Sequence, residues 1–144
     1  MGKFLGIDYG SKRIGLAITD DAKIISSPLD TISNMEIFKF LDKFLNTEDV
    51  ECIVIGMSKR LDNSDNLISK DIHLFSQKIL KKFQIPIHFV DERYTSKIAS
   101  TIIVNSHLKK MQRRNKNLVD KVSASLILET YLNLIKNNNN DFTN

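Results

Sequence analysis

Three acidic side chains stand at positions where a carboxylate needs a specific partner. Asp8 follows the apolar run Phe4-Leu5-Gly6-Ile7, Glu92 follows a second apolar run that ends at Val90, and Asp120 lies within an apolar segment. A carboxylate partly withdrawn from water is costly unless it is paired or binds a metal. Mg²⁺ or Mn²⁺ offsets the repulsion between such acids and also holds phosphate oxygens of a substrate. We therefore expect Asp8, Glu92 and Asp120 to bind a divalent metal, with two ions in one site.

Each of these acids also has a simpler interpretation. Asp8 could serve only to initiate the turn that follows it, and Glu92 could serve only as an ion-pair partner of Arg93. Asp120 could be an acid in the first turn of a helix capped by Asn117, where the helix dipole favours negative charge. No single acid is decisive, so the metal-site prediction depends on all three meeting at one place.

The first part of the chain is expected to form a small antiparallel sheet, with Asp8 beside the turn that joins its first two strands. The connections Gly10-Ser11-Lys12 and Asp20-Asp21-Ala22 are short, which is typical of antiparallel neighbours. A capping-box spacing between Ser33 and Glu36 then predicts the start of a helix. The strands predicted here are Lys3–Tyr9, Arg13–Thr19 and Lys23–Ser26, and the helix is Asn34–Asn46.

The remainder alternates between strands and helices, so it predicts parallel strands joined by crossovers. Together the elements predict an α/β fold, in which three antiparallel strands and then parallel strands form a mixed five-stranded sheet with helices on both faces. Asp8 and Glu92 then fall at the carboxyl ends of their strands, the rim where open α/β sheets bind ligands. The later strands are expected at Glu51–Gly56 and Ile85–Val90, and the later helices at residues 66–83, Thr95–Asn105 and Leu118–Lys136. The apolar side chains expected along one side of the last helix are Val119, Val122, Leu126, Ile127, Thr130, Tyr131 and Leu134.

Basic residues lie close to these acids and in one concentrated segment. Lys12 and Arg13 could hold phosphates or could simply be a charged hairpin turn. Arg93 could clamp a phosphate or steady Glu92, and Thr95 could bind phosphate or cap the following helix. A segment rich in cations is expected to grip a nucleic-acid backbone with salt-dependent affinity, although a solvated loop is the alternative. Its members are Lys109, Lys110, Arg113, Arg114 and Lys116.

Size and composition favour a single domain that acts on a polyanion. The chain has 144 residues and a net charge of +4, with an isoelectric point near 9.2. Residues 1–136 are expected to form one domain, and the asparagine-rich residues 137–144 a disordered tail. The lone Cys52 is expected to be a buried structural thiol, which suits the reducing cytoplasm. No run is apolar enough for a membrane span, and we expect no membrane partner. The three scattered histidines, His73, His88 and His107, lack metal-ligand spacing and are assigned no catalysis.

Four segments resemble, in order, the YqgF family of bacterial proteins, also called RuvX, which have an RNase H-like fold. The resemblance runs from Phe4 to about Leu132. The segments are Gly6-Ile7-Asp8-Tyr9-Gly10-Ser11-Lys12-Arg13-Ile14-Gly15-Leu16-Ala17, Val54-Ile55-Gly56-Met57, Asp91-Glu92-Arg93-Tyr94-Thr95-Ser96 and Asp120-Lys121-Val122-Ser123-Ala124-Ser125-Leu126-Ile127-Leu128.

The resemblance implies a metal-dependent endonuclease that processes the 5′ end of precursor 16S ribosomal RNA in ribosome biogenesis. By motif, the family's metal-binding and catalytic acids fall on Asp8, Glu92 and Asp120. One ion would activate a water for in-line attack on a phosphodiester, and a second would stabilise the leaving oxygen. Such a protein could act as a monomer or as a homodimer.

Three other functions compete with this expectation. Similarity to RuvC-type resolvases implies cleavage of Holliday junctions in DNA recombination and repair, which would need a two-fold dimer. A nucleic-acid-binding module without catalysis, active in transcription or ribosome assembly, would carry the same basic surface, but mere binding of a polyanion would be better served by losing the three acids. A sugar kinase or actin-like ATPase also places an Asp and glycines after its first strand, but needs two such domains, and the chain has neither the second domain nor a second phosphate loop.

Overall fold

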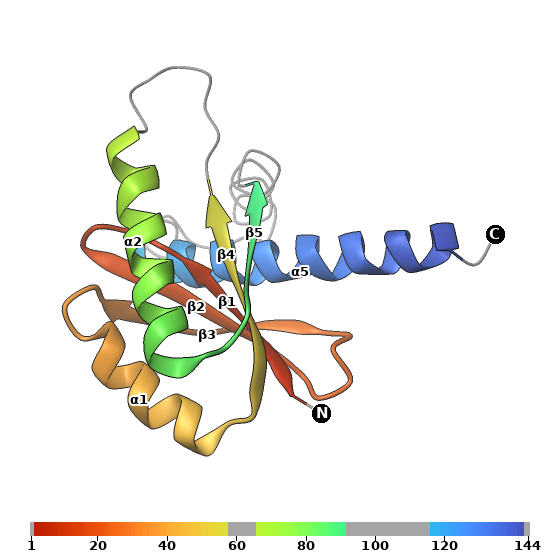
Figure 1. Cartoon of the computed structure of the whole chain (residues 1–144), viewed down its shortest axis with the longest axis horizontal. Coiled ribbons are helices and arrows are strands. Elements are labelled where there is room, and N and C mark those ends of the chain that lie inside the picture. Colours follow the sequence, from red (N-terminus) through yellow and green to blue (C-terminus); the bar gives the residue numbers. More distant parts are fainter. Residues whose placement is uncertain (1, 58–65, 92–115, 143–144) are drawn as a thin grey trace.

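A computed structural model of the chain describes residues 2–57, 66–91 and 116–142. Of residues 66–69, 91, 116–121 and 137–142, only the backbone is described. Five strands form one mixed sheet in the order β3-β2-β1-β4-β5 (Figure 1). The elements are β1 Lys3–Asp8, β2 Arg13–Thr19, β3 Ser26–Ser33, α1 Ile37–Thr47, β4 Val50–Met57, α2 Asn66–Phe83, β5 Ile87–Asp91 and α5 Lys116–Phe142.

The strand pairing confirms the predicted mixed sheet. β1 pairs antiparallel with β2, and β2 pairs antiparallel with β3. On its other side β1 pairs parallel with β4, which pairs parallel with β5. β1 therefore lies in the centre with its backbone hydrogen-bonded on both sides, while β3 and β5 form the two edges.

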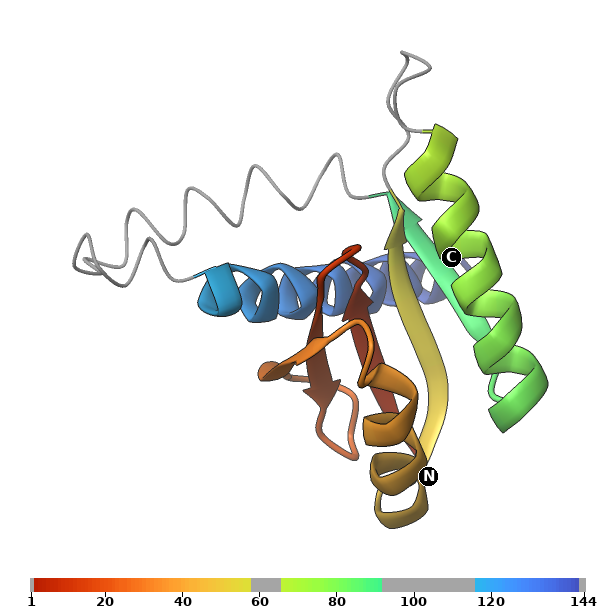
Figure 2. The same ribbon diagram turned by 90° about the vertical axis from the view of Figure 1, so that its left-hand side faces the viewer.

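Helices cover both faces of this sheet, as expected. Alternate residues of β1 and β4 face opposite ways, so Leu5 and Ile55 pack under α1 and α2, whereas Phe4 and Val54 pack under α5. Figure 2 shows α5 lying across the face opposite α1 and α2. In the described part of the chain, no helix is both long enough and apolar enough to span a membrane.

The third strand lies later than predicted. The Asp20 carboxylate accepts the backbone N–H groups of Ile24 and Ile25 at 2.8 and 3.0 Å, which fixes residues 20–25 as the connecting loop. These two hydrogen bonds also lower the pKa of Asp20. β3 then begins at Ser26 and tolerates Pro28 because it is an edge strand.

The predicted capping box is wrong. Ser33 remains in β3, and Glu36 makes no side-chain cap at the start of α1. A backbone turn replaces the box, in which the Glu36 N–H donates to the Ser33 carbonyl at 2.9 Å. The helix consequently begins at Ile37, three residues later than expected from Asn34.

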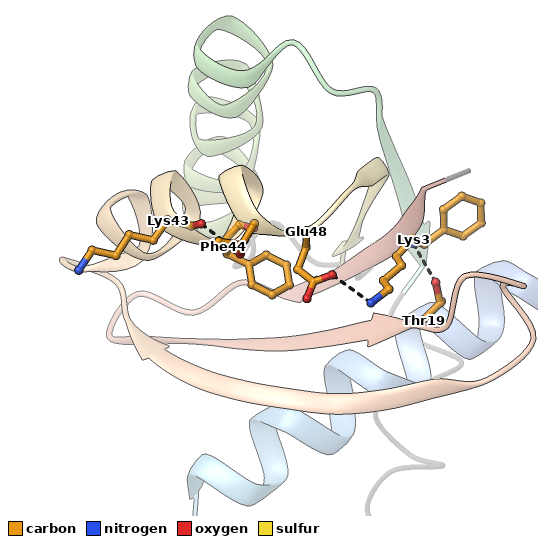
Figure 3. A network of polar contacts seen from close by, with 7 residues as sticks. Lys3, Thr19, Lys43, Phe44 and Glu48 are labelled. Atoms are coloured by element: carbon orange, nitrogen blue, oxygen red, sulfur yellow. Dashed lines mark hydrogen bonds and ion pairs between the residues drawn. The ribbon is translucent and has the colours of Figure 1, made fainter.

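The far end of α1 is tied to the start of β1 (Figure 3). Glu48 closes the helix by donating its N–H to the Phe44 carbonyl at 2.8 Å, and its carboxylate accepts from Lys3 Nζ at 3.0 Å. The Phe4 N–H next to it donates to Thr19 Oγ1 of β2 at 2.8 Å. These bonds hold the amino end of the central strand, while its carboxyl end carries Asp8.

The helix α5 is longer than predicted at both ends. It begins at Lys116 rather than Leu118 and continues to Phe142, through residues expected to be a disordered tail. Extending a helix costs far less than starting one, so a packed helix can carry its hydrogen bonds into a polar end. The helix predicted at Thr95–Asn105 falls outside the described residues.

Candidate functional site

The carboxyl ends of three parallel strands meet at one edge of the sheet, which we call the carboxyl edge. β1 ends at Asp8, β4 at Met57 and β5 at Asp91, and Met57 and Asp91 are register partners. Glu92 is the next residue after Asp91 and lies outside the described residues. The edge therefore contains Asp8 and the strand end from which Glu92 continues, as the sequence predicts.

Asp8 faces the α5 side of the sheet. Tyr9, the following residue, packs on the other side, where its ring lies 5.0 Å from that of Phe75 on α2. Ile7 also packs on that side, so the alternation along the strand turns Asp8 towards α5. The Asp8 side chain is half-buried, and its register partner in β2 is Gly15.

α5 approaches β1 closely near Asp8. A Cβ placed on Gly6 would lie 2.5 Å from Leu128 Cγ and 2.9 Å from the Ala124 carbonyl oxygen, so only glycine permits this contact. Closer to the start of β1, the ring of Phe4 lies 5.6 Å from that of Tyr131. Moving along β1 from Phe4 to Gly6 therefore means moving back along α5 from Tyr131 to Ala124. The amino-terminal turns of α5 consequently extend towards the Asp8 end of β1.

This crossing brings the backbone positions of two predicted acids near one contact. Asp120 precedes Ala124 by four residues, which is one helical turn, and Asp8 follows Gly6 by two strand residues on the same face. Asp8 and Asp120 are 112 residues apart in the sequence, and the contact of Gly6 with Ala124 brings their backbone positions near each other. The Asp120 side chain itself is not described.

The backbone of α5 also bears on the simpler interpretation of Asp120. The helix begins at Lys116, so Asp120 falls in its second turn, and the first turn contains no acidic residue. Helix-dipole stabilisation fades within the first turn. A capping or dipole role consequently explains Asp120 poorly.

Gly56 is next to Asp8 in the register of the sheet. It lies on β4, between β1 and β5. Its neighbour Ile55 pairs with Ile7 of β1, and Gly56 itself pairs with Val90 of β5. Alternation places Gly56, Val90 and Asp8 on the α5 face, and glycine puts no side chain between the acid and β5. The Asp8 carboxylate on this face is an oxygen donor of the kind that a hard divalent cation binds.

No group of three potential metal ligands occurs among the side chains that the structure describes. The predicted set has one described member, Asp8, since Glu92 and the side chain of Asp120 lie outside. For the other two acids, the structure describes the end of β5 before Glu92 and the backbone turn of α5 that contains Asp120.

The turn that follows Asp8 is held by a residue that sequence reasoning missed. Asn34 donates its side-chain amide to the Gly10 carbonyl at 2.7 Å, and its backbone N–H donates to the Lys12 carbonyl at 2.9 Å. Gly10 lies directly against the Arg13 carbonyl, where a Cβ would not fit. The predicted capping box assigned Asn34 to the start of a helix, so only the folded chain reveals its role in this turn.

The predicted phosphate-binding residues are only partly described. Lys12 is exposed in this turn and Arg13 is half-buried at the start of β2, both within a few residues of Asp8. Lys116 is the first residue of α5. The other predicted members, Arg93, Thr95, Lys109, Lys110, Arg113 and Arg114, lie outside the described residues.

Other potentially reactive side chains lie beside aromatic rings or in the core, away from Asp8. His73 lies 5.7 Å from the ring of Phe89, and His88 lies 5.3 Å from that of Tyr131. Cys52 is buried, as predicted, and burial raises the pKa of its thiol to about 11. Burial likewise raises the pKa of Tyr131 to about 12. Cys52 therefore stays protonated near neutral pH and is a poor nucleophile.

Comparison with protein families gives one match over residues 2–134, to the family described as "RuvX: Holliday junction resolvase". Curated relatives carry the name "Putative pre-16S rRNA nuclease". A relative from Christiangramia forsetii is 42% identical over 133 residues, covering 92% of this chain and 98% of its own. One from Porphyromonas gingivalis is 43% identical over 133 residues, covering 92% and 96%.

Solved structures with low sequence identity share the fold. The Thermus thermophilus RuvC chain, solved in complex with a Holliday junction substrate, matches with a TM-score of 0.57 at 13% identity and covers 93% of this chain and 96% of its own. The fowlpox virus resolvase, also solved with junction DNA, matches with a TM-score of 0.56 at 12% identity, covering 92% and 98%. These likenesses confirm the RNase H-like architecture.

Proposed function

The chain belongs to the RuvX family, and from this premise we propose that it is a divalent-metal-dependent endonuclease that trims the 5′ end of precursor 16S ribosomal RNA. One structural observation carries the proposal. The contact of Gly6 with Ala124 and Leu128 directs the helix turn of Asp120 towards the strand end of Asp8. Glu92 is the residue after the end of β5 in the sequence, and we propose that it reaches the same edge. The substrate comes from the names of relatives with about 40% identity.

Asp8 stands on the central strand of the sheet. β1 is hydrogen-bonded on both sides, to β2 and to β4, and Asp8 is its last residue. Asp8 would therefore be a firmly positioned ligand for the divalent metal. When bound, Mg²⁺ or Mn²⁺ would activate water and stabilise the charge that develops on the phosphate.

Glu92 and Asp120 complete the proposed ligand set from opposite sides. Glu92 follows Val90 by two residues, and strand alternation would keep it on the α5 face with Asp8. Asp120 approaches from the helix that covers this face. A carboxylate on a helix turn can adjust its distance through a small shift of the helix, whereas Asp8 cannot move independently of the sheet.

Cations next to Asp8 would orient the scissile phosphate. Lys12 is exposed in the turn that Asn34 fixes, and Arg13 follows it at the start of β2. Arg93 and Thr95 follow Glu92 directly in the sequence and are proposed to add a guanidinium fork and a hydroxyl donor. Together they would hold the phosphodiester against the acids.

The basic segment before α5 would bind the nucleic-acid backbone beyond the cut. It comprises Lys109, Lys110, Arg113, Arg114 and Lys116, and it leads directly into the helix that carries Asp120. Contacts of lysine and arginine with phosphates confer affinity without reading bases. We expect RNA shape to determine where the enzyme cuts. We also expect it to act in the cytoplasm, where ribosomes assemble.

Cleavage of branched DNA is the second candidate function. The family description and the two resolvases solved with junction DNA favour it. A resolvase must cut two strands related by a two-fold axis, so it requires a dimer, whereas an RNA-trimming enzyme can act as a monomer.

A side-by-side cleavage assay tests the proposal. Precursor 16S RNA and a four-way DNA junction are each incubated with the protein in Mg²⁺ or Mn²⁺, with Asp8→Asn as the control for contaminating nuclease. The expected result is metal-dependent cleavage of the RNA that Asp8→Asn lacks. Preferential cutting of the junction would favour the resolvase, and cleavage of neither substrate would contradict an enzymatic role.

A further inference from the structure

A groove lies between α1 and α2 and starts beside the carboxyl edge. Its upper part has a volume of about 150 Å³ and is lined by Tyr9, Asn34 and Leu74 among others. Its lower part, of about 540 Å³, is lined by Phe38, Lys78, Lys81 and Lys82. Phe38 and Lys78 line both parts, so the two hollows adjoin, and we call them together the α1–α2 groove.

The upper part of the groove begins at residues next to Asp8 and its turn, on the opposite face of the sheet from Asp8. Tyr9 follows Asp8 in the chain, and Asn34 is hydrogen-bonded to the turn that carries Lys12. A nucleic-acid strand leaving the carboxyl edge over this turn would enter the upper part of the groove. From there α2 runs away from the edge towards Phe83 (Figure 1).

Three lysines on one face of α2 give the lower part its charge. Lys78, Lys81 and Lys82 are spaced three and four residues apart, so they share one side of the helix, and all three are exposed. Lys82 pairs with Asp42 of α1 at 3.0 Å, in a pair whose side chains remain about half exposed. Asp71 opposes the cations in the upper part. Phosphates would thus be attracted mainly to the lower part.

Aromatic rings form the floor between these charges. Phe38 is half-buried with its ring 5.6 Å from that of Phe75, and Tyr9 lies on the other side of Phe75 at 5.0 Å. Lys82 Nζ lies 5.8 Å from the centre of the Phe38 ring. Proteins that bind single strands combine such rings, on which bases stack, with cations that follow the backbone.

We propose that the α1–α2 groove binds a single-stranded flank of the RNA whose structured part lies at the carboxyl edge. This inference rests on the proposed function, since the flank belongs to the same substrate. It adds a second binding surface on the face of the sheet opposite α5. A substrate with a single-stranded extension would accordingly bind more tightly than the same duplex without one.

The test compares two RNA hairpins that differ by one extension of about eight nucleotides, a length within the range of single-strand sites. Binding is measured by fluorescence anisotropy without divalent metal, so the RNA stays intact. The variant Lys78→Gln/Lys81→Gln/Lys82→Gln keeps most of each aliphatic stem. The matched control, Lys39→Gln/Lys43→Gln/Lys136→Gln, removes the same charge from exposed positions outside the groove.

The groove variant should lose about 10-fold in affinity for the extended hairpin, with a salt slope lower by about two, and should bind the plain hairpin like the wild type. The control variant should bind both hairpins like the wild type. Unchanged binding of the extended hairpin, or an equal loss for both hairpins or for the control, would overturn the proposal. The binding test is independent of the cleavage assay described above. Binding that depends on the extension, together with no cleavage in that assay, would refute the proposed function and still support the groove.

Discussion

Leu128 of α5 lies directly over Gly6 of β1, so close that a Cβ on Gly6 would stand 2.5 Å from Leu128 Cγ. The Ala124 carbonyl oxygen would be 2.9 Å from the same Cβ. Helix backbone cannot swing aside as a flexible side chain can, so the whole helix would have to shift. This contact sets how near the turn of Asp120 comes to Asp8.

Gly6→Ala tests this contact. We expect a loss of about 1–3 kcal/mol in the free energy of unfolding, typical of overpacking, measured by urea denaturation. Adding Leu128→Ala should recover part of the loss, because it removes one of the two clashing groups. An unfolding free energy equal to that of the wild type would contradict the close approach.

Much of this architecture could be predicted from the sequence, because short turns and crossovers dictate strand neighbours. β1 and β2 lie where alternation and the Gly10 turn place them, and the crossovers make β4 and β5 parallel to β1. β3 was misplaced because Pro28 and polar residues hide an edge strand whose position depends on the Asp20 loop.

The buried face of α5 was also only partly predictable. Periodicity favoured larger side chains, including Leu134, which is in fact 50% exposed. The structure buries Ile127, as predicted, but it also buries Ala124 and Leu128, because the sheet beneath offers the small residues Gly6 and Ala17 and lets the helix approach. Such complementarity between distant small residues has no signature within the helix itself. The role of Asn34 was missed for the same reason.

Asn34→Ala should impair catalysis more than stability. It removes the 2.7 Å bond to the Gly10 carbonyl but leaves the backbone bond to Lys12, so the turn loosens without unfolding. We expect a loss of about 1 kcal/mol in unfolding free energy and a fall of about 10-fold in kcat with little change in KM. Asn34→Asp, which cannot donate this bond, should behave alike. The exposed Asn46→Ala is the control, and a kcat unchanged by Asn34→Ala would show that the turn needs no such support.

Neutralising Lys109, Lys110, Arg113 and Arg114 with glutamine should weaken RNA binding uniformly across sequences. If each residue contacts a phosphate, the slope of log affinity against log salt should flatten by about three units. The measurement is binding over a series of salt concentrations. An unchanged slope would mean that this segment does not contact phosphate.

The buried thiol predicts a pH dependence at the alkaline end. The pKa of Cys52 is raised from about 9.0 to about 11 by burial, so between these values the unfolded chain loses its proton while the folded chain keeps it. Stability from this group is thus complete below pH 9 and falls as the pH rises towards 11. We therefore expect the wild type to lose unfolding free energy relative to Cys52→Val when the pH is raised from 8 to 10.5. A constant difference would contradict the raised pKa.

The central claim, that Asp8, Glu92 and Asp120 share a divalent metal, is tested most directly by calorimetric titration of Mn²⁺ into the intact protein. The variants are Asp8→Asn, Glu92→Gln and Asp120→Asn, with the exposed Asp30→Asn on β3 as the matched control. We predict that each of the three variants weakens Mn²⁺ binding at least about 10-fold, since each removes an oxygen ligand and its charge, while the control binds like the wild type. Wild-type affinity in all three variants would contradict a shared metal site.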